Sequence, residues 1–219
     1  MITPLLYKVY RALRRGWKRL TPEAKQAVRN FVASQKTSQG YLNAGGREDA
    51  YYQQFGEVLE AVFSPIRLPF VQFSLTVPES RGKDSVYGRL FEFLEKEMRL
   101  ARPKEIDMRM PDVMTTNAVC CILAVEYQMG HESNMEYVEW LLQRQDETGG
   151  FYASEQAPIP DLLSTAVALF TLHIIGVKAE NATQFIQAHL LDNGGFAPTL
   201  YDDYSDVEYV FYGLLALGN

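Results

Sequence analysis

Three aspartates near the C-terminal end of the sequence have a spacing that suits a metal ion. Asp202, Asp203 and Asp206 lie in the string DDYSD. Carboxylate oxygens are the ligands that Mg²⁺ prefers, and this ion keeps several waters and takes further ligands from the phosphate groups of a substrate. We therefore expect these three residues to bind Mg²⁺ against a diphosphate. The alternative is a structural one, because residues 205–208 also have the spacing of a helix capping box.

Aspartates also stand at the start of each predominantly apolar segment of the chain. They are Asp49, Asp112, Asp161 and Asp206. An acid in this position accepts hydrogen bonds from the first free amides of a helix and complements its dipole, so capping alone can account for it. For chemistry, we expect Asp161, Asp206 and the neighbouring Tyr209 to be the catalytic residues.

Aromatic residues are dense around the same segments. Tyr52 and Phe55 follow Asp49, and Tyr204 and Tyr212 flank Asp206. Aromatic faces stabilise positive charge through their quadrupole, although these side chains can equally be ordinary core. We expect these four residues to bind substrate, together with Arg47. Cations for a diphosphate must come mainly from the first half of the chain, from Arg47, Arg67, Arg81, Lys83 and Arg109.

The elements that position these residues repeat with a period of 45 residues. Trp140 corresponds to Phe185, Gly150 to Gly195 and Asp161 to Asp206, and the clearest repeats are residues 137–176 and 182–218. Such a period indicates stacked helical hairpins. Within each hairpin the first segment (137–145 or 182–191) is amphipathic, and the second (162–175 or 207–217) is apolar nearly all round. A helix that is apolar on every side is buried on every side, so we expect amphipathic outer helices around apolar inner ones.

The rest of the sequence fits the same plan less regularly. Residues 1–20 predict a basic amphipathic helix, and a second helix over 24–35 begins after Thr21 and Pro22. Residues 40–63 resemble a worn repeat, 64–84 an irregular connection because of their prolines, 85–100 an amphipathic helix, and 111–127 an inner helix opened by Asp112. We expect the Gly-Gly-aromatic turns to end the outer helices with a left-handed glycine. The prediction is one domain, 1–219, of about four hairpins.

The residues of these repeats carry a family resemblance. The stretches 143–152 and 161–172 resemble the repeat of protein prenyltransferase β-subunits and squalene/terpenoid cyclases, clearly over 137–218 and fairly over 27–63. The resemblance implies an all-α fold, an α/α toroid around a central apolar cavity that holds an isoprenoid chain. With about four hairpins the toroid is open or incomplete, or is completed by a second copy or a partner subunit.

The same resemblance bears on the reaction. Protein prenyltransferases need a zinc bound by aspartate, cysteine and histidine at the inner helix starts, but Tyr209 stands at the histidine position, so we expect no zinc. The acidic string by which such cyclases protonate their substrate is also absent. The leading expectation is Mg²⁺-assisted prenyl transfer or cyclisation on a prenyl diphosphate. The competing one is a non-catalytic toroid that binds a hydrophobic ligand or a protein.

Composition and charge indicate the class of protein, its partners and its compartment. The chain is 47% hydrophobic and 22% charged, as in soluble globular proteins. Residues 1–29 hold eight basic residues and one acid, a net charge of +7, whereas the remainder carries −13. The segment 1–20 can pack on the acidic body or contact an anionic membrane surface. No nucleic-acid partner is expected. Cys120 and Cys121 are predicted to be buried thiols, which favours the cytoplasm, with peripheral contact to the inner membrane surface as the variant.

Overall fold

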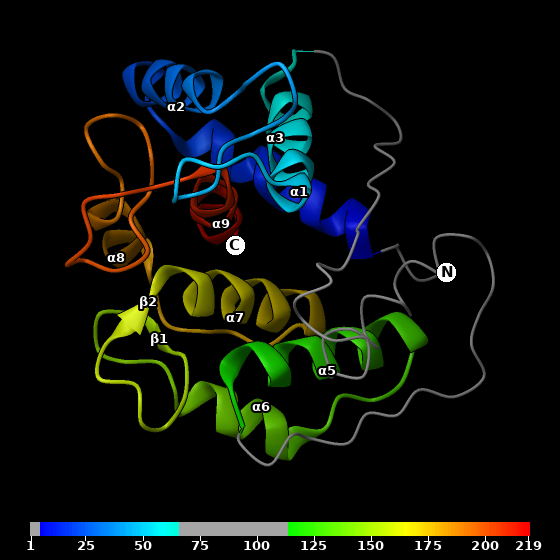
Figure 1. The fold of residues 1–219 in the computed structure, drawn as a ribbon. Coiled ribbons are helices and arrows are strands. Elements are labelled where there is room, and N and C mark those ends of the chain that lie inside the picture. The colour runs from blue at the N-terminus through cyan, green and yellow to red at the C-terminus, as the bar shows by residue number, and fades with distance from the viewer. Residues whose placement is uncertain (1–4, 66–113) are drawn as a thin grey trace.

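The protein is mostly helical. A computed structural model describes residues 5–65 and 114–219, with eight helices and two very short strands in that part (Figure 1). Most of the predicted connection over 64–84 and all of the helix over 85–100 fall outside the described residues. So do Asp112, Arg67, Arg81, Lys83 and Arg109.

Four helices form the inner layer. They are α3 (Ala50–Phe63), α5 (Thr116–Met129), α7 (Leu162–Ile175) and α9 (Val207–Leu217). They pack side by side in the order α5, α7, α9, α3, so that α3 from the start of the chain lies against α9 from its end (Figure 1). The predicted bounds 162–175 and 207–217 are confirmed. Both helices are buried around most of their circumference, as their uniform apolar composition predicts.

Three further helices lie outside this layer. They are α2 (Pro22–Ser34), α6 (Met135–Leu142) and α8 (Thr183–Ala188) (Figure 1). Each buries one face: Val138 and Leu141 on α6, and Phe185 and Ile186 on α8. The prediction of amphipathic outer helices around apolar inner ones is therefore confirmed.

The helix ends differ from the prediction in two places. The outer helix α6 ends at Leu142 with Gln143 as a right-handed C-cap, and Gly149, with φ of 89°, lies in the following turn. The glycine therefore serves the turn, which Asp146 closes by accepting hydrogen bonds from the amides of Thr148 and Gly150. Helix α5 begins at Thr116 with Thr115 as its N-cap, so the prediction that Asp112 opens this helix is wrong.

The aromatic residue of each Gly-Gly-aromatic turn is buried as expected. Phe151 and Phe196 are both fully inaccessible to solvent. Phe151 lies in strand β1 (Phe151–Tyr152), which pairs antiparallel with β2 (Pro160–Asp161). This short pairing places Asp161 directly before α7.

Helix α1 (Leu5–Arg19) lies across the C-terminal ends of the inner helices. Its Arg14 donates hydrogen bonds to the carbonyls of Val62 (2.8 Å) and Ser64 (2.5 Å) at the end of α3. Its Arg15 donates to the carbonyl of Gly218 (2.7 Å) at the end of α9. The same helix touches α5, where the amide of Leu5 donates to the side chain of Gln128 (2.8 Å) and Lys8 lies over the ring of Tyr127.

These contacts account for most of the basic charge at the start of the chain. The last carbonyls of a helix have no partner within it and carry the negative end of its dipole, so cations there are stabilising. Five of the eight basic residues of 1–29 donate to backbone carbonyls, namely Arg14, Arg15, Arg19, Lys25 and Arg29. Packing on the helical body, one of the two alternatives for this segment, is therefore observed.

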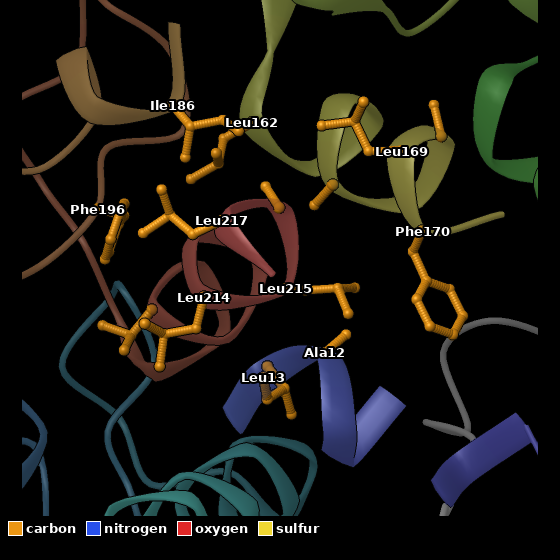
Figure 2. Packing of buried hydrophobic residues seen from close by; sticks show 14 of the residues in the cluster. Ala12, Leu13, Leu162, Leu169, Phe170, Ile186, Phe196, Leu214, Leu215 and Leu217 are labelled. Carbon is orange, nitrogen blue, oxygen red and sulfur yellow. The ribbon is translucent and has the colours of Figure 1, made fainter. Parts of the chain in front are cut away.

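Small residues let α1 approach α9 closely. A Cβ added at Gly16 would lie 1.9 Å from the carbonyl oxygen of Leu214, and one at Gly218 would lie 2.0 Å from that of Ala12. Figure 2 shows α9 between α7 and α1, with Leu214, Leu215 and Leu217 among the buried side chains. The apolar face of α1 is thus part of the core.

No helix within residues 5–65 and 114–219 is long and apolar enough to cross a membrane. Cys120 is buried and Cys121 is partly buried, and neither forms a disulfide. Burial raises the pKa of the Cys120 thiol, so it remains protonated.

The docking of α1 can be tested at Gly16. Gly16→Ala would raise helix propensity by about 1 kcal/mol in an isolated helix. Here we expect the opposite, a loss of about 1–3 kcal/mol in the free energy of unfolding, because the methyl group meets the Leu214 backbone. Denaturant unfolding measures it. Lys18→Ala, at an exposed position of the same helix, is the control and should change stability by less than about 0.5 kcal/mol. A Gly16→Ala protein more stable than wild type would contradict the observed packing.

Candidate functional site

The N-terminal ends of α3, α7 and α9 meet and bring acids and tyrosines together. We call this group the acid–tyrosine cluster; it consists of Tyr51, Tyr52, Asp161, Asp206, Glu208 and Tyr209. The hydroxyl of Tyr51 on α3 donates to the carboxylate of Glu208 on α9 (3.0 Å). Tyr209 lies close enough to Asp206 and Asp161 for both carboxylates to affect its ionisation. The cluster therefore forms at the end opposite to α1.

Asp206 is the most deeply buried acid of the cluster, with 1% of its surface exposed. Its Oδ1 atom caps α9 by accepting from the amide of Tyr209 (3.0 Å), while its Oδ2 atom is buried with no hydrogen-bond partner. Burial raises the pKa of Asp206, and the hydrogen bond from the Tyr209 amide and the nearby hydroxyl of Tyr52 oppose that rise. The net direction is upward, so this carboxyl holds its proton to a higher pH than an exposed aspartate.

Asp206, and not Ser205, is the N-cap of α9, so the capping-box alternative is wrong in its register. The hydroxyl of Ser205 instead accepts from the amide of Phe196 (2.9 Å). Glu208, which a capping box would turn back toward Ser205, accepts from Tyr51.

Asp161 has both oxygens engaged at the start of α7. It accepts from the amide (2.8 Å) and the hydroxyl (2.7 Å) of Ser164. Burial raises its pKa, while these hydrogen bonds and the nearby His189 lower it. His189 is fully buried: its Nδ1 atom bonds the carbonyl of Phe185 (2.9 Å), and its Nε2 atom has no partner. Burial lowers the pKa of His189, which favours the neutral ring.

The three predicted magnesium ligands have different surroundings. Asp202 closes the loop before α9, since its Oδ2 atom accepts from the amide (3.1 Å) and the hydroxyl (2.7 Å) of Thr199. Asp203 is exposed, and Asp206 is buried at the helix cap. Within residues 5–65 and 114–219, no three His, Cys, Asp or Glu side chains are grouped as metal ligands. The described conformation therefore does not fit a magnesium site made of these three carboxylates.

The predicted aromatic residues do meet, in what we call the aromatic seam between α3 and α9. It consists of Tyr51, Tyr52, Phe55, Tyr209, Phe211 and Tyr212, all of them partly buried. The ring of Phe55 lies 5.0 Å from that of Tyr51, 5.1 Å from that of Phe211 and 6.2 Å from that of Tyr212. Most of the ring pairs are edge-to-face, which is a favourable arrangement.

Two predicted substrate-binding residues lie outside the seam. Tyr204 is exposed on the loop before α9, near Asp202 and Asp206. Arg47 is exposed in the turn before α3, where its backbone bonds Asn43. Tyr204 lies close enough to Asp206 and Tyr209 to interact with both electrostatically.

Sequence reasoning missed Tyr51, Glu208 and Phe211 as members of the site. Their only signal was proximity in the sequence to predicted residues. Burial and the neighbouring carboxylates raise the pKa values of Tyr52 and Tyr209, so both keep their hydroxyl protons and can donate hydrogen bonds.

Residues 113–217 match the family model of the prenyltransferase alpha-alpha toroid domain. No curated protein and no solved structure matches the chain. The match includes Asp161, Asp206, Glu208 and Tyr209, whereas Tyr51, Tyr52 and Phe55 come from α3, which precedes it.

The raised pKa of Asp206 predicts a pH dependence of stability. A folded-state pKa above the ordinary value near 3.8 stabilises the fold at low pH, and this contribution is lost as the pH rises through the folded-state value. Asn caps a helix about as well as Asp but cannot ionise. We therefore expect the free energy of unfolding of Asp206→Asn to fall less than that of wild type between about pH 4 and pH 7, by denaturant titration. Asp203→Asn, an exposed control on the same loop, should follow wild type. Parallel curves for wild type and Asp206→Asn would show that burial does not shift this carboxyl.

Proposed function

Because residues 113–217 carry a prenyltransferase alpha-alpha toroid domain, we propose that the protein holds an isoprenoid chain at the N-terminal ends of its inner helices. The observation that carries this proposal is the aromatic seam, whose partly buried rings lie beside the buried carboxylate of Asp206. Aromatic rings bury large areas of an apolar ligand, and burial of apolar surface drives its binding.

At the opposite end of the inner helices α1 covers the ends of α3 and α9, and a hollow of about 250 Å³ remains beside Arg19, His173 and Leu217. Helix α1 packs over their C-terminal ends and fixes them through Arg14 and Arg15. We therefore place the ligand at the acid–tyrosine cluster and not beneath α1.

The arrangement suits a reaction through a carbocation, of the transferase or cyclase type. In our proposal Asp206 is the proton donor: its proton passes to one carbon of a double bond, and the other carbon becomes positive. Burial raises the pKa of Asp206 and so favours the protonated acid, and Tyr52 lowers the energy of the carboxylate that forms. The rings of Tyr209 and Tyr212 offer their faces to the positive charge. Asp161, beside Tyr209, adds negative charge to the same region.

No step of this proposal passes through a metal ion. Asp202 and Asp206 already accept hydrogen bonds within a loop and at a helix cap. The expected absence of zinc stays a prediction, to be checked by elemental analysis of protein purified without added zinc.

A second candidate function is a non-catalytic toroid that binds a hydrophobic ligand or a partner. One observation favours it: Asp161 and Asp206 both cap helices, and capping alone explains acids in these positions. Completion of the toroid by a second copy of the chain or by a partner subunit remains a proposal. So does contact of residues 1–20 with a membrane surface, which would have to use the exposed polar face of α1.

Binding can be tested with farnesol. At about 100 times its dissociation constant it should add roughly 2.7 kcal/mol to the free energy of unfolding, seen as a rise in melting temperature. Phe55→Leu keeps apolar volume but removes a ring from the seam. We expect it to weaken binding by roughly threefold to tenfold, the value of an aromatic contact beyond its area. Tyr201→Leu, on an 84% exposed ring outside the seam, is the matched control. Equal affinities of wild type and Phe55→Leu for farnesol would show that the aromatic seam does not bind the ligand.

Catalysis and metal dependence need a separate experiment. Farnesyl diphosphate and a longer prenyl alcohol are incubated with the protein, with and without Mg²⁺, and products are sought by mass spectrometry. We expect products that disappear in Asp206→Asn while farnesol still binds. Binding without any product would favour the second candidate. Stabilisation by farnesyl diphosphate should be the same with and without Mg²⁺. If part of this stabilisation requires Mg²⁺ and is abolished in the double variant Asp202→Asn with Asp203→Asn, the three aspartates would be supported as a magnesium site.

A further inference from the structure

Exposed apolar side chains gather on the loop before α9. Leu200 is 52% exposed and the adjoining Tyr201 is 84% exposed. Asp203 is exposed on the same loop and has no ion-pair partner among residues 5–65 and 114–219. Single exposed apolar residues are ordinary, whereas a group of them beside an unpaired charge is typical of a surface that binds a protein. We call Leu200, Tyr201 and Asp203 the loop patch.

This loop is held in a fixed shape. Asp202 accepts hydrogen bonds from the amide (3.1 Å) and the hydroxyl (2.7 Å) of Thr199, and the amide of Tyr201 donates to the same hydroxyl (3.2 Å). The turn therefore keeps Leu200 and Tyr201 at the surface. A surface that is ordered beforehand loses less conformational freedom on binding than a loose loop does, which favours a contact of small area.

A patch of opposite charge lies on α1. Tyr7 and Arg11 are one helical turn apart on its exposed face, and the guanidinium of Arg11 lies 5.9 Å from the centre of the Tyr7 ring. Tyr7 is 44% exposed. In the part of the chain that the structure describes, Arg11 forms no ion pair, whereas Arg14 and Arg15 donate to carbonyls at helix ends. We call Tyr7 and Arg11 the helix patch.

The two patches lie at opposite ends of the molecule. Helix α1 crosses the C-terminal ends of the inner helices with its apolar side against them, so the helix patch faces away from those ends. The loop patch leads into the N-terminal end of α9 (Figure 1). The patches therefore cannot meet within one chain, but they can meet between two copies.

We propose that the loop patch of one copy binds the helix patch of a second copy, head to tail. In this contact the carboxylate of Asp203 pairs with the guanidinium of Arg11, and Leu200 and Tyr201 pack on the ring of Tyr7. The planar guanidinium matches a carboxylate, and aromatic rings bury large areas at interfaces. The contact goes beyond the proposed function and does not depend on it. Because it joins the ends of the molecule, it also differs from completion of the toroid.

The size and symmetry of the contact determine its strength and form. The patches are small and an exposed ion pair contributes little, so we expect weak association, in the micromolar range or weaker. A head-to-tail contact uses a different surface on each copy, so it continues into rings or open chains. The average mass in solution should therefore rise beyond that of two chains as the concentration increases.

Sedimentation equilibrium of the full chain, from about 1 µM to about 500 µM, measures this rise. Arg11→Glu and Asp203→Arg each place like charges across every contact, and Tyr201→Ser removes the ring. We expect each of these changes to weaken association at least about tenfold. Lys18→Glu is the matched control, because it makes the same change of net charge about 10 Å further along the exposed side of α1. It should keep association within about threefold of wild type.

A mixture tests the pairing directly. When Arg11→Glu and Asp203→Arg chains are combined in equal amounts, each altered patch meets the opposite charge on the other variant. We expect association to return in the mixture, although each variant alone stays largely monomeric. A mixture as weakly associated as its two components would overturn the pairing of Asp203 with Arg11.

Other outcomes would overturn the contact as a whole. One is a wild-type chain that stays monomeric over the whole range, and another is an Arg11→Glu chain that associates like wild type. A mass that levels off at two chains would indicate a closed dimer through other surfaces. If wild type stays monomeric but sediments with phosphatidylserine vesicles, and Arg11→Glu does not, the helix patch binds a membrane surface and not a second copy.

Discussion

The hydrogen bonds from the arginines of α1 to the last carbonyls of α3 and α9 are the interaction on which the arrangement of charge depends. They join the first helix of the chain to its last one, across a separation of 203 residues for Arg15 and Gly218. Each arginine satisfies carbonyls that have no partner within their own helix and neutralises the negative end of a dipole. The close approach at Gly16 makes these bonds possible, because a side chain there would hold the two helices apart. These basic residues lie at this end, whereas the capping aspartates of α7 and α9 lie at the other.

Helix capping and chemistry compete for the same carboxylates at that other end. Asp161 uses both oxygens on Ser164, which leaves little for a ligand. Asp206 uses one oxygen on the amide of Tyr209 and keeps the second buried and unpaired. Capping explains why an aspartate is present at both positions, but it does not explain why one oxygen of Asp206 lacks a partner. A group that costs stability in the unliganded fold is a candidate for a role in the liganded one.

The sequence predicted best what depends on local composition and least what depends on distant contacts. The bounds of α7 and α9 followed from continuous apolar segments between an aspartate cap and a glycine. The end of α6 was misplaced because Gly149 serves the turn after the helix, six residues beyond the C-cap Gln143. The hydrogen bond between Tyr51 and Glu208 joins residues that are 157 positions apart in the sequence, and no periodicity predicts it. The spacing of Asp202, Asp203 and Asp206 suggested a metal site. In the structure Asp202 accepts hydrogen bonds within a loop, Asp206 caps α9 and Asp203 is exposed.

The packing of α3 against α9 has a consequence for how the site can vary. Stacking of hairpins along the chain would place α9 beside α7 alone, but its other side is covered by the first hairpin, so the aromatic seam is shared between the two ends of the sequence. The half of the site on α7 and α9 belongs to the matched toroid domain, whereas Tyr51, Tyr52 and Phe55 do not. Changes on α3 can therefore alter the shape and polarity of the seam without disturbing the caps and apolar faces that hold the repeats together. We expect ligand specificity to depend on α3, and the stability of the array to depend on α7 and α9.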